Sequence, residues 1–338
     1  MGISVIIGKN YNLSLLSQYR TQLMGMAALM IILCHAPQYG VEMPSLIHKL
    51  FVYLNIGVDI FLFLSGMGCG FSLMKSPNYF TWIKKRFIRI FVPYTFVLVF
   101  FRLLGLLFVD VSWERWLLNY STIRFWTHHD GPWFIALLVL LYPLTPLIYW
   151  IFVRFKRRNL IAFTLIVLLL LITHIHICTH IDVINSVIRN LQWAFTRVVS
   201  FIIGLYLAPY IKQNLKVNTI YVIGASALGC ILFHFFMKDV FYLWLYVLPT
   251  LIILSSLLKR ISKVSKLNCF FLWLGAASLE SYLTNVELKG LMPAIIYKWA
   301  NNPIFFGHYL DYTLVIVFGL CSTFITHFIS KRITATMQ

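Results

Sequence analysis

The sequence predicts an all-α polytopic membrane protein, folded as a single helical bundle over residues 1–338. Composition is the first reason: 60% of the residues are hydrophobic and 11% are charged, with a mean hydropathy of +0.84, whereas soluble domains carry roughly 25% charged residues. The second reason is a series of apolar stretches that approach the ~20 residues needed to cross a bilayer. The ten predicted transmembrane helices are 23–37, 50–74, 91–109, 132–153, 159–177, 193–211, 217–236, 240–258, 269–290 and 311–329.

The segments between these stretches support the predicted topology, because basic residues gather in every second connecting segment. Of the 28 Lys and Arg residues, nineteen lie on the side that holds both chain ends and seven lie on the other side. Basic residues mark the cytoplasmic side of a membrane protein, so we expect a multi-pass protein of the cell membrane with both termini in the cytoplasm. The net charge of +18 then favours contact with anionic lipid over nucleic acid.

The segment 78–92, between the second and third stretches, is too charged to cross a bilayer. At helical spacing Phe80 and Phe87 share one face, and Lys85, Arg86 and Arg89 share the opposite face. This pattern predicts a basic amphipathic helix at the cytoplasmic interface. Its cationic face suits either anionic lipid or the phosphates of a cytosolic cofactor.

Six ionisable residues stand out within the predicted transmembrane stretches, most of them in the half away from the cytoplasm. Each costs at least ~2.5–3.5 kcal/mol to insert, so each is a candidate for function. Two interpretations stay open: a shared polar cavity, or buried pairs between helices such as Arg102 with Asp59 or Arg197 with Glu280. The six residues are His35, Asp59, Arg102, Arg197, Glu280 and Glu287.

His35 is the strongest candidate for a catalytic residue among the six, because an imidazole takes up and returns a proton near neutral pH. The alternative is a hydrogen-bonded packing residue. His174, His176 and His180 have a spacing that does not place them on one helical face, so a metal site there is only weakly indicated. The sequence has no nucleotide-binding, zinc-protease or serine-hydrolase motif in a usable context.

Several landmarks occur in an order that resembles the integral-membrane acyltransferase-3 family, and the resemblance covers nearly the whole chain. They are Met24-Gly25-Met26-Ala27-Ala28 with His35, Gly57-Val58-Asp59-Ile60-Phe61 with Leu64-Ser65-Gly66, Lys85-Arg86-Phe87-Ile88-Arg89 with Pro93-Tyr94, Trp133-Phe134 with Tyr142 and Pro146, Arg197 with Phe201 and Gly204, and Leu274-Gly275 with Ser278-Leu279-Glu280-Ser281-Tyr282-Leu283. The resemblance implies an enzyme that moves an acyl group, typically acetyl, from cytosolic acyl-CoA to a hydroxyl of an extracytoplasmic glycan or lipid-linked sugar.

The resemblance also implies roles for single residues. It points to His35 as the catalytic histidine and to Arg86 and Arg89 as the arginines of the donor side. Two positions depart from the family pattern. Met24 stands where many members have Arg, with Arg20 one helical turn earlier, and Asn285 stands where members often have His.

These expectations combine into one mechanism. Acyl-CoA, a co-substrate rather than a bound cofactor, docks its phosphates on Lys85, Arg86 and Arg89 and reaches His35 through a passage in the bundle. His35 acts as general base with Asp59 orienting its ring. Arg102 or Arg197 stabilises the oxyanion, and the loop Trp126 to Trp133 stacks on the acceptor sugar. The rival is a transporter or flippase of a polar or lipid-linked substrate, with the same buried charges lining its path.

Overall fold

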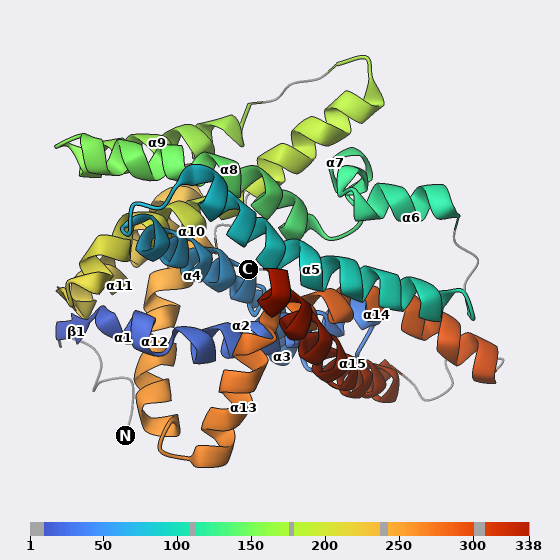
Figure 1. Ribbon diagram of the computed structural model, residues 1–338. Helices are drawn as coiled ribbons and strands as arrows, with labels where there is room; N and C mark the ends of the chain where they lie inside the picture. Colours follow the sequence, from blue (N-terminus) through green and yellow to red (C-terminus); the bar gives the residue numbers. More distant parts are fainter. Residues whose placement is uncertain (1–9, 109–111, 176–178, 237–242, 301–307, 338) are drawn as a thin grey trace.

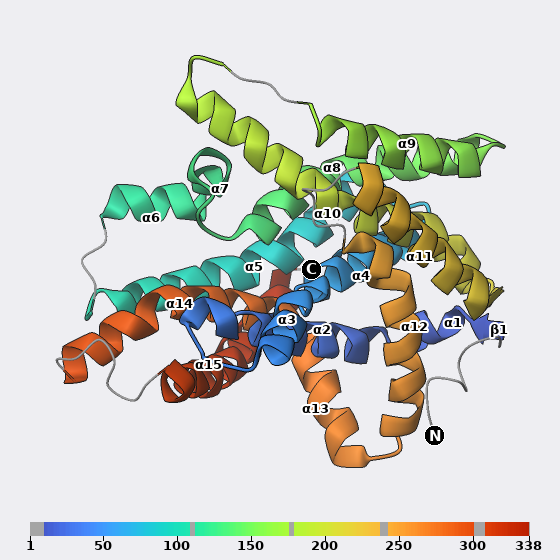
Figure 2. The same ribbon diagram turned by 180° about the vertical axis from the view of Figure 1, so that it is seen from behind.

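The computed structural model describes residues 10–108, 112–175, 179–236, 243–300 and 308–337, and almost all of them are helical. Figure 1 shows the helices arranged as one bundle, and Figure 2 shows it from behind. The helices are α1 (Ser14–Gln18), α2 (Arg20–Cys34), the 3₁₀ helix η2 (Ala36–Tyr39), α3 (Ser45–Tyr53), α4 (Ile56–Leu73), α5 (Tyr79–Gly105), α6 (Trp113–Tyr120), α7 (Ile123–His128), α8 (Trp133–Arg154), α9 (Arg158–Ile172), α10 (Asp182–Lys212), α11 (Thr219–Phe236), α12 (Trp244–Ile261), α13 (Ser265–Ala276), α14 (Ser278–Ala300) and α15 (His308–Met337).

The prediction of an all-α membrane bundle agrees with this structure, but ten spanning helices are not confirmed. Within the described residues, 6 segments are long and apolar enough to cross a membrane. They are Ser45–Leu73, Tyr79–Gly105, Trp133–Arg154, Asp182–Lys212, Trp244–Ile261 and Tyr312–Met337, and each matches one predicted stretch.

The other four predicted stretches fold differently. Helices α2 and α9 have 15 residues each, and the apolar part of α11 is Thr219–Ile231. The stretch 269–290 is broken at Ala277, where α13 ends and α14 begins. A helix of 15 residues rises only ~23 Å, less than the ~30 Å hydrocarbon core.

The basic segment 78–92 does not form a helix of its own but is the first half of α5, and its interfacial position stays a prediction. Asn78 caps the helix by accepting hydrogen bonds from the backbone of Phe80 and Thr81, and the helix then runs 27 residues with Pro93 inside it. Long basic side chains can reach the interface from the end of a spanning helix. Amphipathic periodicity therefore continues into a spanning segment without a break.

Glycines let two pairs of helices approach closely. A Cβ placed on Gly204 of α10 would lie 2.0 Å from the carbonyl oxygen of Phe63 in α4, and one on Gly66 would lie 2.1 Å from the carbonyl of Phe201. Gly275 of α13 approaches α2 in the same way, with a Cβ 1.7 Å from the carbonyl of Thr21. Small residues at such contacts are the usual means of packing helices in a membrane.

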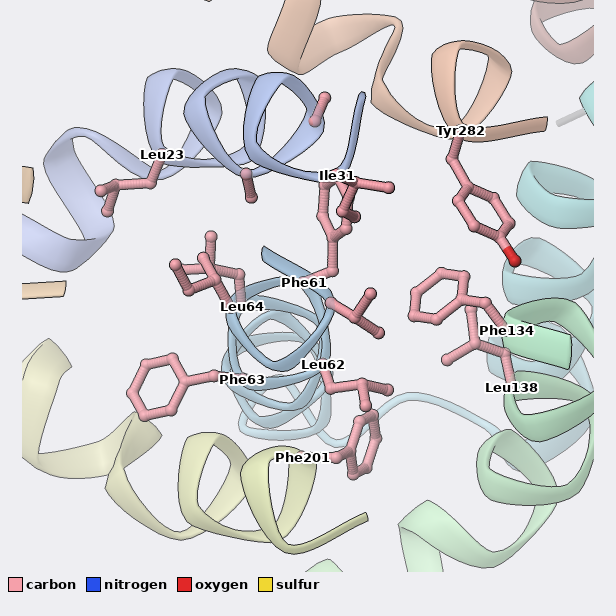
Figure 3. Close-up of a cluster of buried hydrophobic side chains, with 14 of the residues drawn as sticks. Leu23, Ile31, Phe61, Leu62, Phe63, Leu64, Phe134, Leu138, Phe201 and Tyr282 are labelled. Carbon is pink, nitrogen blue, oxygen red and sulfur yellow. The ribbon is translucent and has the colours of Figure 1, made fainter. Parts of the chain in front are cut away.

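The hydrophobic core is centred on α4, between α2, α8, α10 and α14. Figure 3 shows Phe61 and Leu62 of α4 facing Phe134 and Leu138 of α8, with Tyr282 of α14 reaching in from above. The rings of Phe134 and Tyr282 lie 5.5 Å apart. This core fixes how α14 lies against α2 and α4, which matters for the candidate site.

A short β-ladder, which the sequence pattern does not predict, joins distant parts of the chain. Strand β1 (Asn10–Asn12) pairs antiparallel with β2 (Lys216–Asn218), with Tyr11 opposite Val217. The Tyr11 hydroxyl lies 2.5 Å from Ser255 Oγ of α12. The segment before α2 is thereby held against α10 and α12.

Candidate active site

His35 lies where α2 gives way to the 3₁₀ helix η2. The imidazole is partly buried, and its Nδ1 is hydrogen-bonded to Oδ1 of Asn285 on α14. Two further contacts fix this end of α2: Tyr312 of α15 donates to the carbonyl of Ile32, and Lys289 of α14 donates to Gln38. The imidazole therefore stands on a turn that is held by both α14 and α15.

The contact with Asn285 determines which nitrogen of His35 is basic. An amide oxygen accepts hydrogen bonds, so Nδ1 carries the proton and Nε2 carries the lone pair. No described residue hydrogen-bonds to Nε2. The ring is thus oriented at one nitrogen and open for proton transfer at the other.

Asp59 does not orient His35, contrary to the sequence-based expectation. Asp59 is fully buried in α4 and accepts hydrogen bonds from Arg197 and Ser200 of α10, the latter at 2.9 Å. Arg197 is 3% exposed and also lies over the ring of Trp193 at 5.9 Å. These contacts make Asp59 and Arg197 a buried ion pair that joins α4 to α10, about two turns from the close approach at Gly66 and Gly204.

The other charged candidates also form contacts different from the suggested pairs. Glu280 of α14 accepts from His327 Nδ1 at 3.1 Å and from Ser330 Oγ at 2.5 Å, both on α15. Arg102 of α5 lies over the ring of Trp113 at 4.6 Å. Neither the pair Arg102–Asp59 nor the pair Arg197–Glu280 forms; Asp59 pairs with Arg197 instead. These contacts assign Glu280 to the α14–α15 contact.

The loop carrying Trp126 to Trp133 is held against α10. Asn190 of α10 donates to the carbonyls of Phe125 and Trp126, and its Oδ1 lies 2.6 Å from His129 Nδ1. Trp133 lies edge-on to Trp193, with ring centroids 4.6 Å apart. The aromatic residues of this loop therefore pack on one another and on α10.

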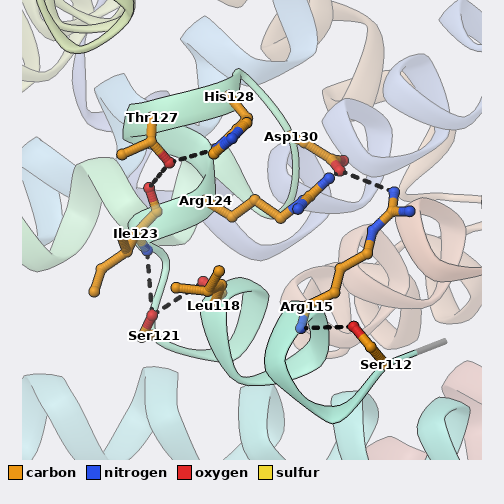
Figure 4. Close-up of polar contacts among 9 residues, drawn as sticks. All are labelled: Ser112, Arg115, Leu118, Ser121, Ile123, Arg124, Thr127, His128 and Asp130. Carbon is orange, nitrogen blue, oxygen red and sulfur yellow. Dashed lines mark hydrogen bonds and ion pairs between the residues drawn. The ribbon is translucent and has the colours of Figure 1, made fainter. Parts of the chain in front are cut away.

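An ion-pair cluster closes the same loop. Arg124 and Arg115 both approach Oδ2 of Asp130, at 2.7 Å and 3.4 Å, as Figure 4 shows. Partial burial by itself raises the pKa of Asp130, but the hydrogen bond and charge of Arg124, with those of Arg115, outweigh burial and leave the pKa below its ordinary value.

Arginines from two helices meet at Gly68 of α4. Arg86 of α5 donates to the carbonyl of Gly68 at 3.1 Å, and Arg20 donates to the carbonyl of Leu64 at 3.3 Å. The Arg20 guanidinium would lie 3.0 Å from a Cβ on Gly68, so a larger residue there would push the end of the Arg20 side chain aside. The side chains of Lys85 and Arg89 are exposed, so Arg86 alone of the three turns into the bundle.

No described carboxylate forms an ion pair with Arg20 or Arg86; the acidic partners in the described part of the chain serve other cations. Two cations that meet without a carboxylate favour an anionic ligand. Arg20 was noted in the sequence only as a displaced counterpart of Met24, so its meeting with Arg86 is a result of the structure.

The cavities among the described residues include the following three. One, of about 340 Å³, is lined by residues of α5, α6, α14 and the loop at Asp130. The others are apolar and lie between α10, α11 and α12 and between α5 and α15. His35, Arg20 and Arg86 line none of these three. Among the described residues no group of His, Cys, Asp and Glu is suited to a metal, and His176 lies outside them.

Sequence reasoning missed two residues that the structure brings to these clusters. Asn285 appeared only as a departure from a family pattern, and His327 was not singled out. Asn285 lies 250 positions from His35 in the sequence, so only the packing of α14 on α2 reveals the contact. The signal available beforehand was a polar residue in the middle of an apolar stretch.

Comparison with known proteins gives the enzyme class. The sequence model described as "Acyltransferase domain", of the acyltransferase-3 family, matches residues 23–331, which include every residue of the clusters above except Arg20. No curated protein and no solved structure matches the chain. The match covers most of the 338 residues and decides for an acyltransferase over a transporter. The chain belongs to the integral-membrane acyltransferase-3 family, enzymes that transfer acyl groups other than amino-acyl groups.

Proposed function

We propose that this acyltransferase moves an acyl group, in the simplest case acetyl, from cytosolic acyl-CoA to a hydroxyl of an extracytoplasmic glycan or lipid-linked sugar. The observation that carries the proposal is the pair His35–Asn285. Asn285 engages Nδ1 of the ring, and no described residue engages Nε2. This is the arrangement that a general base requires, because one nitrogen fixes the ring and the other receives the proton.

The reaction then follows from ordinary acyl-transfer chemistry. Nε2 of His35 takes the proton of the acceptor hydroxyl while its oxygen attacks the thioester carbonyl. The tetrahedral intermediate collapses with cleavage of the carbon–sulfur bond, and the coenzyme A thiolate leaves. The protonated imidazole returns its proton to that thiolate, so the histidine ends in its starting state. Asn285 takes the positioning role that the sequence suggested for Asp59.

Arg20 and Arg86 form the donor side of the proposal. Both side chains meet at Gly68 of α4 with no described carboxylate beside them. Positive charge without a protein counter-ion suits the phosphates of coenzyme A. Lys85 and Arg89 are exposed on the same stretch of α5 and extend this charge toward the cytoplasm. The proposal includes a passage that brings the thioester from this cluster to His35.

Arg197 and Glu280 have structural parts in the proposal. Arg197 pairs with Asp59, and Glu280 is engaged by His327 and Ser330. An oxyanion donor must be free to face the developing charge, and Arg197 already faces a carboxylate. Arg102 lies over Trp113 and lines a cavity that His35 does not line, so the proposal gives neither arginine the oxyanion role.

The experiment follows labelled acetyl from acetyl-CoA into envelope glycans of membranes that contain the full chain. Wild type should transfer label, and Arg20→Gln and Arg86→Gln should raise the KM for acetyl-CoA. Lys84→Gln is the matched control, because Lys84 is exposed one turn from the cluster and contacts neither Gly68 nor Leu64. Unchanged donor KM in both arginine variants would sink the donor assignment. Label retained as free acetate or intact acetyl-CoA, with no labelled glycan, would sink the acceptor assignment.

A further inference from the structure

The cavity beside α6 contains polar atoms that the fold leaves without partners. It measures about 340 Å³, within the range of small-molecule sites. Glu287 and Gly290 of α14 form one wall, Arg102 of α5 forms another, and Asn119 and Trp116 of α6 form a third. No described residue donates a hydrogen bond or forms an ion pair to the Glu287 carboxylate. Oδ1 of Asn119 is buried and also has no partner.

Unpartnered acceptors in a partly closed cavity indicate a ligand that donates hydrogen bonds. A buried acceptor left unsatisfied is costly, roughly 1–3 kcal/mol and more for a charged group. Oδ1 of Asn119 is such an acceptor, and the half-buried carboxylate of Glu287 adds to the same cavity a second acceptor with no described partner. Native proteins fill such sites with water or with a ligand that carries hydroxyl or amine groups.

The charged side chains around the cavity indicate whether its ligand carries hydroxyl or amine groups. Arg102 and Arg115 line it together with Asp130 and Glu287, so positive and negative side chains are equal in number. The two arginines disfavour a cationic amine, and the two carboxylates disfavour an anion. A neutral ring with several hydroxyls matches all of them, because each hydroxyl both donates and accepts.

The surroundings of the cavity are rigid enough to recognise a ring. Tyr94 of α5 donates to the backbone carbonyls of Asn119 and Tyr120 at 3.0 Å each, which holds the end of α6 on α5. Trp116 stacks on Tyr120 with centroids 5.5 Å apart. On the opposite side Arg115 and Arg124 fix Asp130, as Figure 4 shows. A preformed site binds with less loss of entropy than a mobile one.

We propose that this cavity is a binding site for a neutral saccharide ring, with Glu287 and Asn119 accepting hydrogen bonds from its hydroxyls. Positions 285 and 287 lie roughly 200° apart around a helix, so the cavity and His35 lie on different sides of α14. The inference rests on the proposed function only in that the saccharide would be a unit of the acceptor glycan that is not the one acylated.

Binding to the purified full chain tests the proposal without acyl transfer. Methyl glucoside and N-acetylglucosamine are titrated while tryptophan fluorescence is recorded, with putrescine as a cationic probe and inorganic phosphate as an anionic probe. A saccharide should change the fluorescence of wild type, and Trp116→Phe should diminish the change. Glu287→Gln and Asn119→Leu should each weaken binding about tenfold or more.

Two further variants separate the cavity from its surroundings. Gly290→Leu should block binding without disturbing the fold, because no atom lies within 4 Å of a Cβ at Gly290. Glu114→Gln removes an exposed carboxylate of α6 that does not line the cavity, and it should bind like wild type. Putrescine or phosphate binding in place of both saccharides overturns the proposal, as does saccharide binding that is equal in Gly290→Leu and wild type. His35→Gln should bind saccharide normally, so failure of this site and failure of the catalytic proposal give different results.

Discussion

Two buried polar pairs in this enzyme differ in how completely their atoms are satisfied. Asp59 accepts from both Arg197 and Ser200 and is fully buried. His35 is held by Asn285 at one nitrogen, and among the described residues nothing engages the other. A satisfied pair contributes to the fold, whereas a ring that is fixed at one nitrogen and open at the other is suited to chemistry. The comparison predicts that the two sites respond to mutation in opposite ways.

The largest effect on activity is expected for His35→Gln. Loss of a general base reduces acyl transfer by about 10²–10⁴-fold, while the melting temperature of the purified protein should stay near that of wild type, because His35 has one hydrogen bond to lose. Labelled acetyl transfer and thermal unfolding in the same detergent check both. Full activity in a well-folded His35→Gln protein would remove the distinction between the two pairs.

Asp59→Ala should act mainly on stability. It leaves Arg197 buried without its carboxylate, and breaking a buried pair in this way costs about 3–5 kcal/mol. Folded protein recovered from membranes and its unfolding midpoint measure the effect. Asp59→Ala with Arg197→Met, which removes both charges, should recover much of the loss. If Asp59→Ala folds as well as wild type but is inactive, Asp59 belongs to the chemistry and the comparison fails.

Gly204→Ala sharpens the comparison by disturbing the α4–α10 contact without touching a charge. The added methyl would lie 2.0 Å from the carbonyl of Phe63, so the helices must separate, at a cost of about 1–3 kcal/mol. Gly224→Ala on α11 is the matched control, because nothing lies within 4 Å of its Cβ. Thermal unfolding should separate the two variants, and equal midpoints would show that the close approach contributes nothing.

The smallest effect is expected at Asp130, an exposed ion pair that serves as a reference for the buried ones. Its carboxyl pKa is lower in the folded protein, mainly because the hydrogen bond and charge of Arg124 outweigh burial. The pair therefore stabilises above the unfolded value of roughly 3.9, and this stabilisation is lost as the pH falls through the lower folded value. Solvent screening at 45% side-chain exposure holds it below about 1 kcal/mol. Asp130→Asn should lower the unfolding midpoint slightly at neutral pH, and the difference should vanish once the pH falls below the lowered folded pKa of Asp130, where both proteins carry a neutral side chain.

Sequence reasoning succeeded where the hydropathy of a single segment was enough to predict a helix. The apolar runs that form α4, α5, α8, α10, α12 and α15 are each long enough to be identified without knowledge of their neighbours. Hydropathy does not register a break such as the one at Ala277, where both flanking segments are apolar, so the stretch 269–290 was predicted as one helix. Charge periodicity likewise could not show that segment 78–92 continues into α5.

In the candidate site, too, single residues could be predicted from the sequence but their partners could not. His35 was identified because an imidazole in an apolar stretch is unusual in itself. Its partner Asn285 was not identified, because the sequence pointed to Asp59, and only the packing of α14 against the end of α2 reveals the contact. The meeting of Arg20 with Arg86 at Gly68 likewise became visible only when the structure placed α2, α4 and α5 together.

The most direct test of the account is the pH dependence of acyl transfer in Asn285→Asp beside wild type. A carboxylate at Nδ1 favours the protonated imidazole, so the account predicts that the acid limb of the kcat/KM profile moves to higher pH and that Asn285→Leu, which cannot orient the ring, loses activity without such a shift. Identical profiles and rates in wild type, Asn285→Asp and Asn285→Leu would show that His35 does not act as a base oriented by Asn285.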